Sequence, residues 1–151
     1  MTIQINQQSV EFSTAAQINI EDLAEIASLG FKTVINNRPD GEGGDAQPKS
    51  ADLAAAAKKL GLAYIYIPVV PNNIQPDQVE AYAKAYASAA KPVLGFCRTG
   101  NRAANIRNMA LNVEQAKGVI AWLKSKCLIT RLWRWYKSDC SKNTGCGTCK
   151  K

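Results

Sequence analysis

The feature that most constrains the fold of this chain is the alternation of short apolar runs with amphipathic segments along residues 17–111. Apolar residues at helical spacing predict helices over 17–30 and 76–90. An alanine-rich segment that ends in lysines predicts a helix over 50–60 with Ser50 as its cap, and a further helix is expected to begin within 100–111. Runs rich in β-branched and aromatic residues predict strands over 31–37, 62–70 and 92–96. A strand, a loop and a helix that repeat three times predict an α/β domain with a central, mainly parallel sheet flanked by helices.

Charge divides the chain into two parts. Residues 1–120 carry 11 Lys and Arg against 11 Asp and Glu, whereas residues 121–151 carry 8 Lys and Arg against the single Asp139. The formal net charge of +7 therefore arises entirely in the last part. We predict one domain over residues 1–120 and a basic, aromatic and cysteine-rich tail over 121–151. Because the domain itself is neutral, we predict no nucleic-acid partner.

The absence of histidine excludes several classes of enzyme at once. The chain has no Ser-His-Asp triad, no Cys-His pair and no histidine-ligated zinc. Its five cysteines are an odd number in a charged chain, which does not suit a disulfide scaffold and favours a reducing compartment. No stretch has the pattern of a signal peptide or a membrane span, so we expect a cytoplasmic protein.

Three polar segments directly follow the predicted strands. They belong to the sequences INNRPDGE, IPVVPNN and FCRTGNRAA, which begin at residues 35, 67 and 96. In a parallel sheet the carboxyl ends of the strands share one edge, and ligands bind there. The three segments are therefore expected to converge on one site.

The loop FCRTGNRAA combines a nucleophile with groups that bind an anion. A strand that feeds a glycine-containing loop and then a helix directs backbone N–H groups and a helix dipole into one concavity, which favours an oxyanion and the Cys97 thiolate. Gly100 permits the turn, and Arg102 can close over the anion with its two-pronged guanidinium. The alternative is that Cys97 is an ordinary buried side chain and the arginines are surface charges.

These patterns give a set of candidate site residues. As catalytic residues we predict Cys97, Arg102 and Asp40. As substrate-binding residues we predict Arg98, Thr99, Gly100, Asn101 and Arg38. We predict neither a metal nor a cofactor for this site.

The carboxylates of RPDGEGGD have two interpretations. Asp40 is suited to act as a general acid or to orient Arg102, but a Pro-Asp-Gly turn explains the same residue through backbone geometry. The two interpretations of Asp40 stay open, whereas for Glu42 we favour the turn. Arg38 is expected to face the pocket because it lies at a strand end.

The tail has two features of its own. Trp122, Trp133, Trp135 and Tyr136 alternate with basic residues, which favours a helix whose aromatic side chains pack on the domain over one that lies on a membrane surface. The thiols Cys140, Cys146 and Cys149 fit a redox pair, a metal site completed by Cys127, or incidental cysteines of a terminus. The sequence does not decide among the three.

Four motifs in this order resemble the phosphatase-like domain of the beta-lactamase hydrolase-like proteins, a branch of the tyrosine/dual-specificity phosphatase fold. They are TVINNRPDGE, GLAYIYIPV, PNNIQPDQVEAYAKA and PVLGFCRTGNRAAN, and the resemblance runs from about Phe12 to Ala110. The resemblance implies a phosphatase-like fold in which Cys97 is the nucleophile and Arg102 binds the oxyanion. It also implies that Arg38, Asp40 and Glu42 border the pocket.

The chain departs from the pattern of protein phosphatases in three places. Four residues instead of five separate Cys97 from Arg102, and Phe96 stands where a histidine usually precedes the cysteine. The usual general-acid aspartate would fall near Val70 or Pro71, neither of which donates a proton. The loop CRTGNRAA looks more like the six-residue loop of rhodanese sulfurtransferases.

We therefore rank three functions from the sequence. The first is a rhodanese-type transfer of sulfane sulfur through a Cys97 persulfide, with a small oxyanion or persulfide as substrate and a thiol as acceptor. The second is the hydrolysis of phosphate monoesters through a phosphocysteine. The third is a non-catalytic module that binds anions.

Overall fold

The computed structural model describes residues 3–140, with side chains described over residues 3–122. It confirms the predicted α/β class, with a sheet in the order β1-β2-β5-β3-β4. β1 and β2 are antiparallel, and the other neighbours are parallel. The elements in chain order are β1 (Ile5–Ser9), β2 (Phe12–Ala15), α1 (Asp22–Ser28), β3 (Thr33–Asn36), the 3-10 helix η1 (Gly44–Ala46), α2 (Ser50–Lys59), β4 (Ala63–Tyr66), α3 (Pro76–Ser88), β5 (Val93–Phe96) and α4 (Asn101–Cys140).

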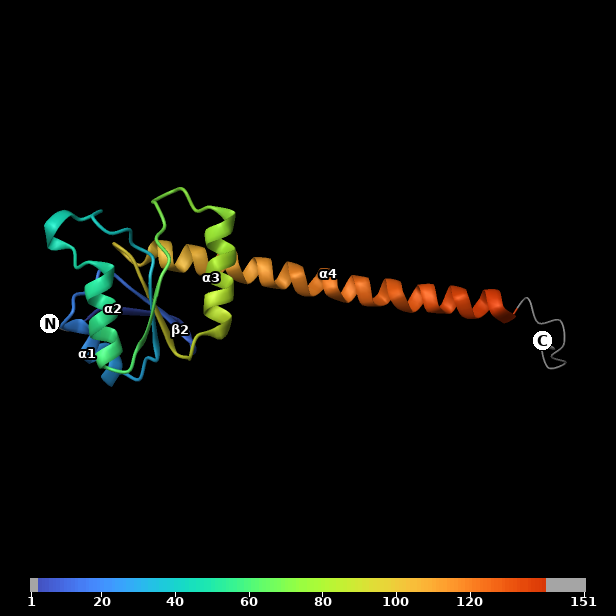
Figure 1. Ribbon diagram of the computed structural model, residues 1–151, viewed down its shortest axis with the longest axis horizontal. Helices are drawn as coiled ribbons and strands as arrows, with labels where there is room; N and C mark the ends of the chain where they lie inside the picture. The colour runs from blue at the N-terminus through green and yellow to red at the C-terminus, as the bar shows by residue number, and fades with distance from the viewer. Residues whose placement is uncertain (1–2, 141–151) are drawn as a thin grey trace. The chain divides into compact units, whose positions relative to one another are not determined.

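The sheet is the middle of three layers. α1 and α2 cover one face, while α3 and the beginning of α4 cover the other (Figure 1). In β3, Val34 packs with Leu23 and Leu53 in one core, whereas its neighbour Ile35 packs with Tyr82 in the other. The alternation arises because successive side chains of a strand point to opposite faces. Two hydrophobic cores therefore hold the sheet between its helices.

β5 lies in the centre of the sheet, and its glycine allows close packing on one face. A Cβ at Gly95 would lie 3.0 Å from Cζ of Phe12 and 3.2 Å from Cβ of Ala103. Because interiors are close-packed, a larger side chain at Gly95 would push β5 away from α4. Gly95 thus keeps β5, the strand that directly precedes Cys97, next to the helix that carries Arg102.

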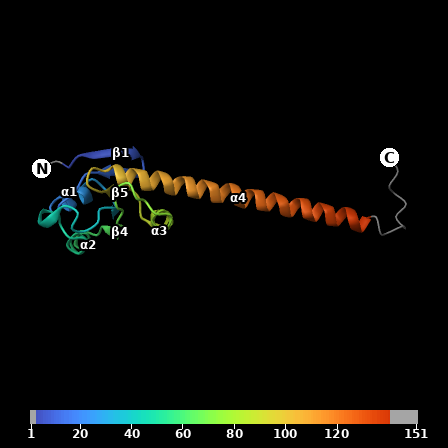
Figure 2. The same cartoon turned by 90° about the horizontal axis from the view of Figure 1, so that it is seen from above.

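The antiparallel hairpin of β1 and β2 was not among the predicted elements. β1 has the polar sequence INQQS and is mostly exposed, because it forms one edge of the sheet, opposite to β4 (Figure 2). β2 is buried, but its sequence FSTA places two polar residues between Phe12 and Ala15. Neither INQQS nor FSTA has the run of apolar residues that revealed the other strands in the sequence.

Helix starts follow the predicted signals in part. α3 begins at Pro76, as expected, and Gln75 and Gln78 form a capping box before it. In α2 we expected Ser50 to be the cap, and this is wrong because Ser50 is the first helical residue. The backbone N–H of Ser50 donates to Oδ1 of Asp40 at 2.9 Å. A side chain from the preceding loop therefore satisfies the start of α2, which no local pattern reveals.

The chain separates into two compact units, Met1–Val113 and Glu114–Lys151. The division that we predicted from charge, at residues 120 and 121, stays a prediction. No helix among the described residues is both long enough and apolar enough for a membrane span. The tail side chains that we singled out beyond Trp122 lie outside the described side chains: Cys127, Trp133, Trp135, Tyr136, Cys140, Cys146 and Cys149. Their packing, redox and metal-binding roles stay predictions.

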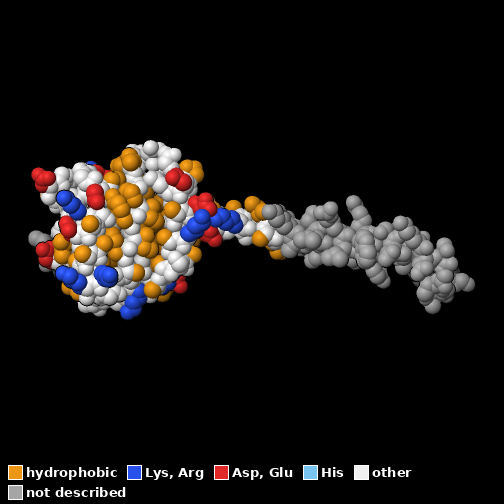
Figure 3. Space-filling model, in the orientation of Figure 1, with side chains coloured by type: hydrophobic (Ala, Val, Ile, Leu, Met, Phe, Trp, Pro, Cys, Tyr) orange, Lys and Arg blue, Asp and Glu red, His pale blue; other side chains and the backbone are white. Residues whose placement is uncertain are grey.

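Figure 3 shows how charges are distributed on one face of the unit Met1–Val113. Lys and Arg side chains are interspersed with Asp and Glu side chains around a hydrophobic area, with no large region of a single sign. This agrees with the equal numbers of basic and acidic residues in 1–120. A local cluster of charge, and not a general field, must therefore provide any anion binding on this unit.

Tyr64, which is half-buried, and Tyr82, which is fully buried, make a test of the packing. The Tyr64 hydroxyl accepts a hydrogen bond from Nδ2 of Asn36 at 2.9 Å and lies 3.2 Å from Oγ of Ser50, whereas the Tyr82 hydroxyl is buried without a partner among the described residues. We expect Tyr64→Phe to lower the free energy of unfolding by roughly 1–2 kcal/mol, and Tyr82→Phe to leave it unchanged or raise it. Urea unfolding of both variants measures this. An equal loss in both would contradict the assignment.

Candidate active site

Three loops meet at one edge of the sheet because three parallel strands end there in register. Asn36 at the end of β3 pairs with Tyr66 of β4 and with Phe96 of β5. The backbone N–H of Asn37 donates to the carbonyl of Phe96 at 2.9 Å, which extends the pairing past the strand ends. The predicted convergence of the three segments is confirmed.

The loop between β5 and α4 folds around the thiol of Cys97. Cys97 is fully buried, and its Sγ accepts a hydrogen bond from the backbone N–H of Gly100 at 3.1 Å. Gly100 has a φ of +89°, and a Cβ there would lie 3.2 Å from the carbonyl oxygen of Ala15. Both conformation and space therefore require glycine at this position. The bond from its N–H stabilises negative charge on the sulfur.

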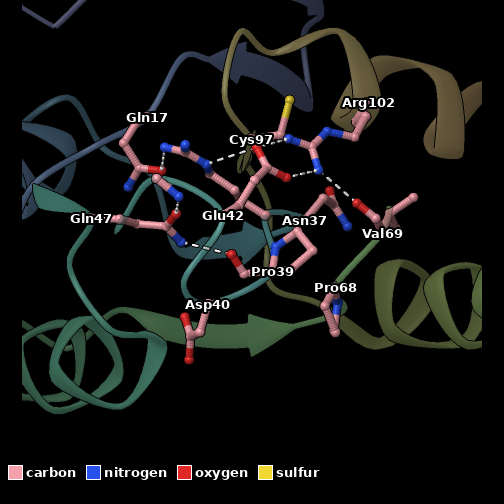
Figure 4. A network of polar contacts seen from close by, with 12 residues as sticks. Gln17, Asn37, Pro39, Asp40, Glu42, Gln47, Pro68, Val69, Cys97 and Arg102 are labelled. Carbon is pink, nitrogen blue, oxygen red and sulfur yellow. Dashed lines mark hydrogen bonds and ion pairs between the residues drawn. The ribbon is translucent and has the colours of Figure 1, made fainter. Parts of the chain in front are cut away.

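Arg102, on the first turn of α4, connects all three loops. Its Nη1 and Nη2 donate to Oε2 and Oε1 of Glu42, each at 2.7 Å. Nη1 also donates to the carbonyl of Val69 at 2.6 Å. Figure 4 shows the guanidinium between Glu42 and Val69, near Cys97. A two-pronged arginine–carboxylate pair of this kind is among the stronger hydrogen-bonded contacts in proteins.

The ion pair shifts the pKa of both partners. The hydrogen bonds from Arg102 are the largest cause of a lowered pKa of Glu42, and with the charge of Arg38 they outweigh the burial of the carboxylate. Burial acts to lower the pKa of Arg102, but the hydrogen bonds and charge of Glu42, with a further contribution from Cys97, raise it overall. At neutral pH both side chains are therefore charged.

Arg38 braces Glu42. Arg38 is 8% exposed, its Nε donates to Oε1 of Glu42 at 3.1 Å, and its Nη1 donates to Oε1 of Gln17 at 2.9 Å. Gln47 holds the same loop through hydrogen bonds to two of its backbone groups. We expected Arg38 to bind substrate, but the structure engages its guanidinium with Glu42 and Gln17. Arg38 therefore positions the carboxylate.

Asp40 does not lie where we expected a catalytic carboxylate. Its Oδ1 accepts the N–H of Ser50, and its own N–H donates to the Tyr66 hydroxyl at 3.0 Å. In Figure 4 its carboxylate points away from Cys97 and Arg102. The structure thus places the side chain of Asp40 at the start of α2 and not beside Cys97. Glu42, for which we favoured a turn role, is the carboxylate that reaches Arg102.

A cleft of about 460 Å³ opens beside the ion pair. The residues that line it are Glu42, Pro71, Asn72, Ile74, Arg98, Thr99, Asn101, Arg102 and Asn105. The predicted residues Arg98, Thr99 and Asn101 thus lie on the cleft, whereas Gly100 is buried against the sulfur. Pro71, at the position where a general acid was expected, lines the wall and offers no proton.

Among the cleft residues, Asn72, Ile74 and Asn105 carried no site prediction from the sequence. Asn72 has a φ of +59°, a left-handed conformation that asparagine tolerates, within the loop after β4. Asn105 lies one turn into α4 and carried no signal that distinguished it from a surface residue. Among the described residues, no three Cys, Asp or Glu side chains gather closely enough to hold a metal ion.

Because the pKa of Glu42 is lowered in the folded state, the contribution of the ion pair to stability is expected to depend on pH. A carboxyl whose pKa is lowered in the folded state stabilises that state above its unfolded pKa, and the contribution is lost as pH falls through the folded pKa. We expect Glu42→Gln to lower the free energy of unfolding at pH 7 by roughly 1–3 kcal/mol, and this difference to shrink as the pH approaches the acid range.

The matched control is Glu114→Gln, which removes the exposed pair with Lys117. We expect it to change the free energy of unfolding by less than about 0.5 kcal/mol at any pH. Urea titrations from pH 3 to pH 8 compare the two variants. A loss from Glu42→Gln that does not depend on pH would show that the carboxylate charge is not the stabilising feature.

The chain is similar to known proteins over most of its length. The family model of the beta-lactamase hydrolase-like protein, phosphatase-like domain, matches residues 5–116. The chain is 34% identical to a beta-lactamase hydrolase-like protein of Xylella fastidiosa and 35% identical to one of Agrobacterium fabrum. Both alignments cover 101 residues, which are 67% of this chain. The chain spans only 22% of the length of these relatives.

Solved structures have the same fold. A proposed phosphatase from Neisseria meningitidis is 33% identical, with a TM-score of 0.62 over 68% of this chain and 72% of that one. A proposed phosphatase from Shewanella putrefaciens is 24% identical, with a TM-score of 0.62 over 75% of this chain and 69% of that one. The strand order, the buried Cys97 and the family match over residues 5–116 lead to one conclusion. The chain belongs to the phosphatase-like domain family of the beta-lactamase hydrolase-like proteins.

Proposed function

We propose that the chain hydrolyses phosphate monoesters, with Cys97 as the nucleophile. The observation that carries the proposal is the position of a buried thiol beside an arginine fork, at the carboxyl edge of a phosphatase-like fold. From sequence alone we ranked sulfur transfer first. The family match and the solved relatives favour the phosphatase hypothesis, and we reverse the order.

Substrate binding has to displace an internal anion. Glu42 occupies the two nitrogens of Arg102 that suit an oxyanion. A phosphoryl group would exchange its oxygens for the carboxylate on this fork, because both anions match the same donor geometry, while Glu42 would keep the hydrogen bond from Nε of Arg38 and with it its negative charge. Gly41 and Gly44 flank this part of the loop with positive φ values, so the loop is built on residues with wide backbone freedom.

The chemistry follows from the contacts of the sulfur. The Cys97 thiolate attacks phosphorus, an S–P bond forms, and the P–O bond breaks with its electron pair on the leaving oxygen. Water then attacks the phosphocysteine, the S–P bond breaks, and orthophosphate departs. The Gly100 N–H, 3.1 Å from the sulfur, stabilises the thiolate both before attack and when it leaves.

One observation favours sulfur transfer as a second candidate. The only carboxylate among the residues that line the cleft is Glu42, which is committed to Arg102. Attack of a thiolate on sulfane sulfur releases sulfite or a thiolate, neither of which needs a proton to depart. A cleft without a free acid is therefore compatible with a Cys97 persulfide and a thiol acceptor.

Substitutions in the loop test the phosphatase hypothesis. We expect Cys97→Ser to reduce hydrolysis of p-nitrophenyl phosphate to background, because it removes the nucleophile. Arg102→Ala should lower kcat/KM by roughly 100-fold, because one donor of this kind is often worth that much. Asp40→Asn keeps an oxygen for the Ser50 N–H and should leave kcat/KM within about twofold. A large loss of kcat/KM in Asp40→Asn with unchanged stability would restore a catalytic role for Asp40.

A second assay on the same protein separates the two chemistries. We expect Cys97-dependent release of orthophosphate from aryl phosphates to exceed the formation of thiocyanate from thiosulfate and cyanide. The comparison uses the full chain at one pH, with Cys97→Ser as the blank for both reactions. Rapid thiocyanate formation without Cys97-dependent phosphate release would place sulfur transfer first.

A further inference from the structure

The described residues that line the cleft include no group that could protonate a leaving group. Among its lining residues Glu42 alone has a carboxyl, and both of its oxygens accept hydrogen bonds from Arg102 at 2.7 Å. Oε1 also accepts one from Arg38. The remaining lining residues are two arginines, which stay protonated, and side chains that do not titrate. The residues of the cleft therefore provide anion binding without acid catalysis.

This arrangement restricts the substrates that the enzyme can cleave well. An alkyl ester leaves as a strongly basic alkoxide, and a positioned acid typically accelerates such a step by about 10²–10⁴-fold. A phosphate that leaves from an anhydride needs no such help, because its second pKa is only about 6. It departs as an anion at neutral pH. Without an acid, the site favours leaving groups whose conjugate acids have a low pKa, namely aryl oxides and phosphates.

The other residues that line the cleft distinguish between aryl oxides and phosphates as leaving groups. No aromatic side chain lines the cleft, so a phenyl ring would find only Pro71 and Ile74 as apolar partners. The carboxamides of Asn72, Asn101 and Asn105 offer polar contacts around the cleft. A charged and strongly hydrated leaving group suits this surface better than a ring does.

Arg98 provides the second positive charge. It lines the same cleft as Arg102, is exposed, and forms no ion pair with any described residue. Glu42, by contrast, neutralises Arg102 in the substrate-free state. The cleft therefore has one arginine next to the reacting thiol and another whose guanidinium is available to a second anionic group.

We propose that the cleft takes a phosphoanhydride, with the terminal phosphoryl group at Cys97 and Arg102 and the adjoining phosphate, which is the leaving group, at Arg98. The inference rests on the proposed phosphatase function and specifies its substrate class. Sγ of Cys97 bonds to the terminal phosphorus, and the bridging P–O bond breaks with its electron pair on the oxygen of the adjoining phosphate. Water then cleaves the S–P bond, orthophosphate is released, and the proton of the water passes to phosphate or solvent.

The test compares leaving groups on the full chain. Orthophosphate release is measured with inorganic pyrophosphate, uridine diphosphate, p-nitrophenyl phosphate and phosphoserine, with Cys97→Ser as the blank. We expect kcat/KM for at least one of the two diphosphates to exceed that for p-nitrophenyl phosphate, and phosphoserine to be the poorest substrate. Across a series of aryl phosphates, log kcat/KM should fall steeply as the pKa of the phenol rises, because no acid assists departure.

The role of Arg98 is tested by the ratio of two rates. We expect Arg98→Ala to lower kcat/KM for the diphosphate about tenfold more than for p-nitrophenyl phosphate, since only the diphosphate brings a second anionic group. Lys84→Ala is the matched control: it removes a positive charge from the exposed face of α3, away from the cleft residues, and should leave the ratio unchanged. An equal loss for both substrates in Arg98→Ala would overturn the role of Arg98.

The outcomes separate this inference from the function on which it rests. Cys97-dependent cleavage of p-nitrophenyl phosphate, with diphosphates no better than phosphoserine, would overturn the phosphoanhydride assignment and leave the phosphatase function standing. Efficient cleavage of phosphoserine, or a flat dependence on leaving-group pKa, would reveal a proton donor and also overturn it. No Cys97-dependent release from any of the four compounds would overturn the phosphatase function itself.

Discussion

The ion pair between Glu42 and Arg102 is the interaction on which the site depends. Glu42 belongs to the loop after β3, Arg102 begins α4, and the same guanidinium binds the carbonyl of Val69 in the loop after β4. Loss of Glu42 would leave Arg38 and Arg102, whose side chains are mostly buried, without their shared counter-ion, which is costly. One contact therefore fixes three segments that are far apart in the sequence, and with them the walls of the cleft.

The same contact limits the chemistry of the site. Glu42 holds Arg102 in place because it is ionised, and an ionised carboxylate with two arginine partners has no proton to give. The network continues through Arg38 to Gln17 beyond β2, so the position of Glu42 is determined from both sides. Under the proposed hydrolysis, the interaction that organises the cleft thus also removes Glu42, the only carboxylate among the described lining residues, from acid catalysis.

The sheet brings these side chains within reach of one another. β3 and β5 pair residue by residue from Thr33 with Val93 to Asn36 with Phe96, so the loops that follow begin at the same level. Gly95 lets α4 lie close to β5, and Gly100 turns the chain back so that its N–H meets the sulfur. Two glycines only five positions apart therefore serve different purposes, one for packing and one for backbone conformation.

The sequence by itself determined the class of the fold and the place of the reactive loop. Its periodic apolar residues predicted α1, α2, α3, the start of α4 and the three strands that carry the loops, and the spacing of Cys97, Gly100 and Arg102 indicated an oxyanion site. These features are local, so they can be read within a window of a few residues. The hairpin of β1 and β2 was missed because its strands, INQQS and FSTA, are rich in polar residues and lack the apolar runs of the other strands.

Only the tertiary structure decided which carboxylate serves the site. Asp40 and Glu42 stand two residues apart in one loop, and the sequence left a catalytic role open for Asp40 while it favoured a turn role for Glu42. In the fold, the start of α2 provides a backbone N–H for Asp40, while α4 brings Arg102 to Glu42. The partners of both carboxylates come from other elements of the chain, 10 and 60 residues away. The roles of these side chains were therefore determined by the packing of the helices on the sheet, because no local pattern encodes which distant donor a carboxylate will meet.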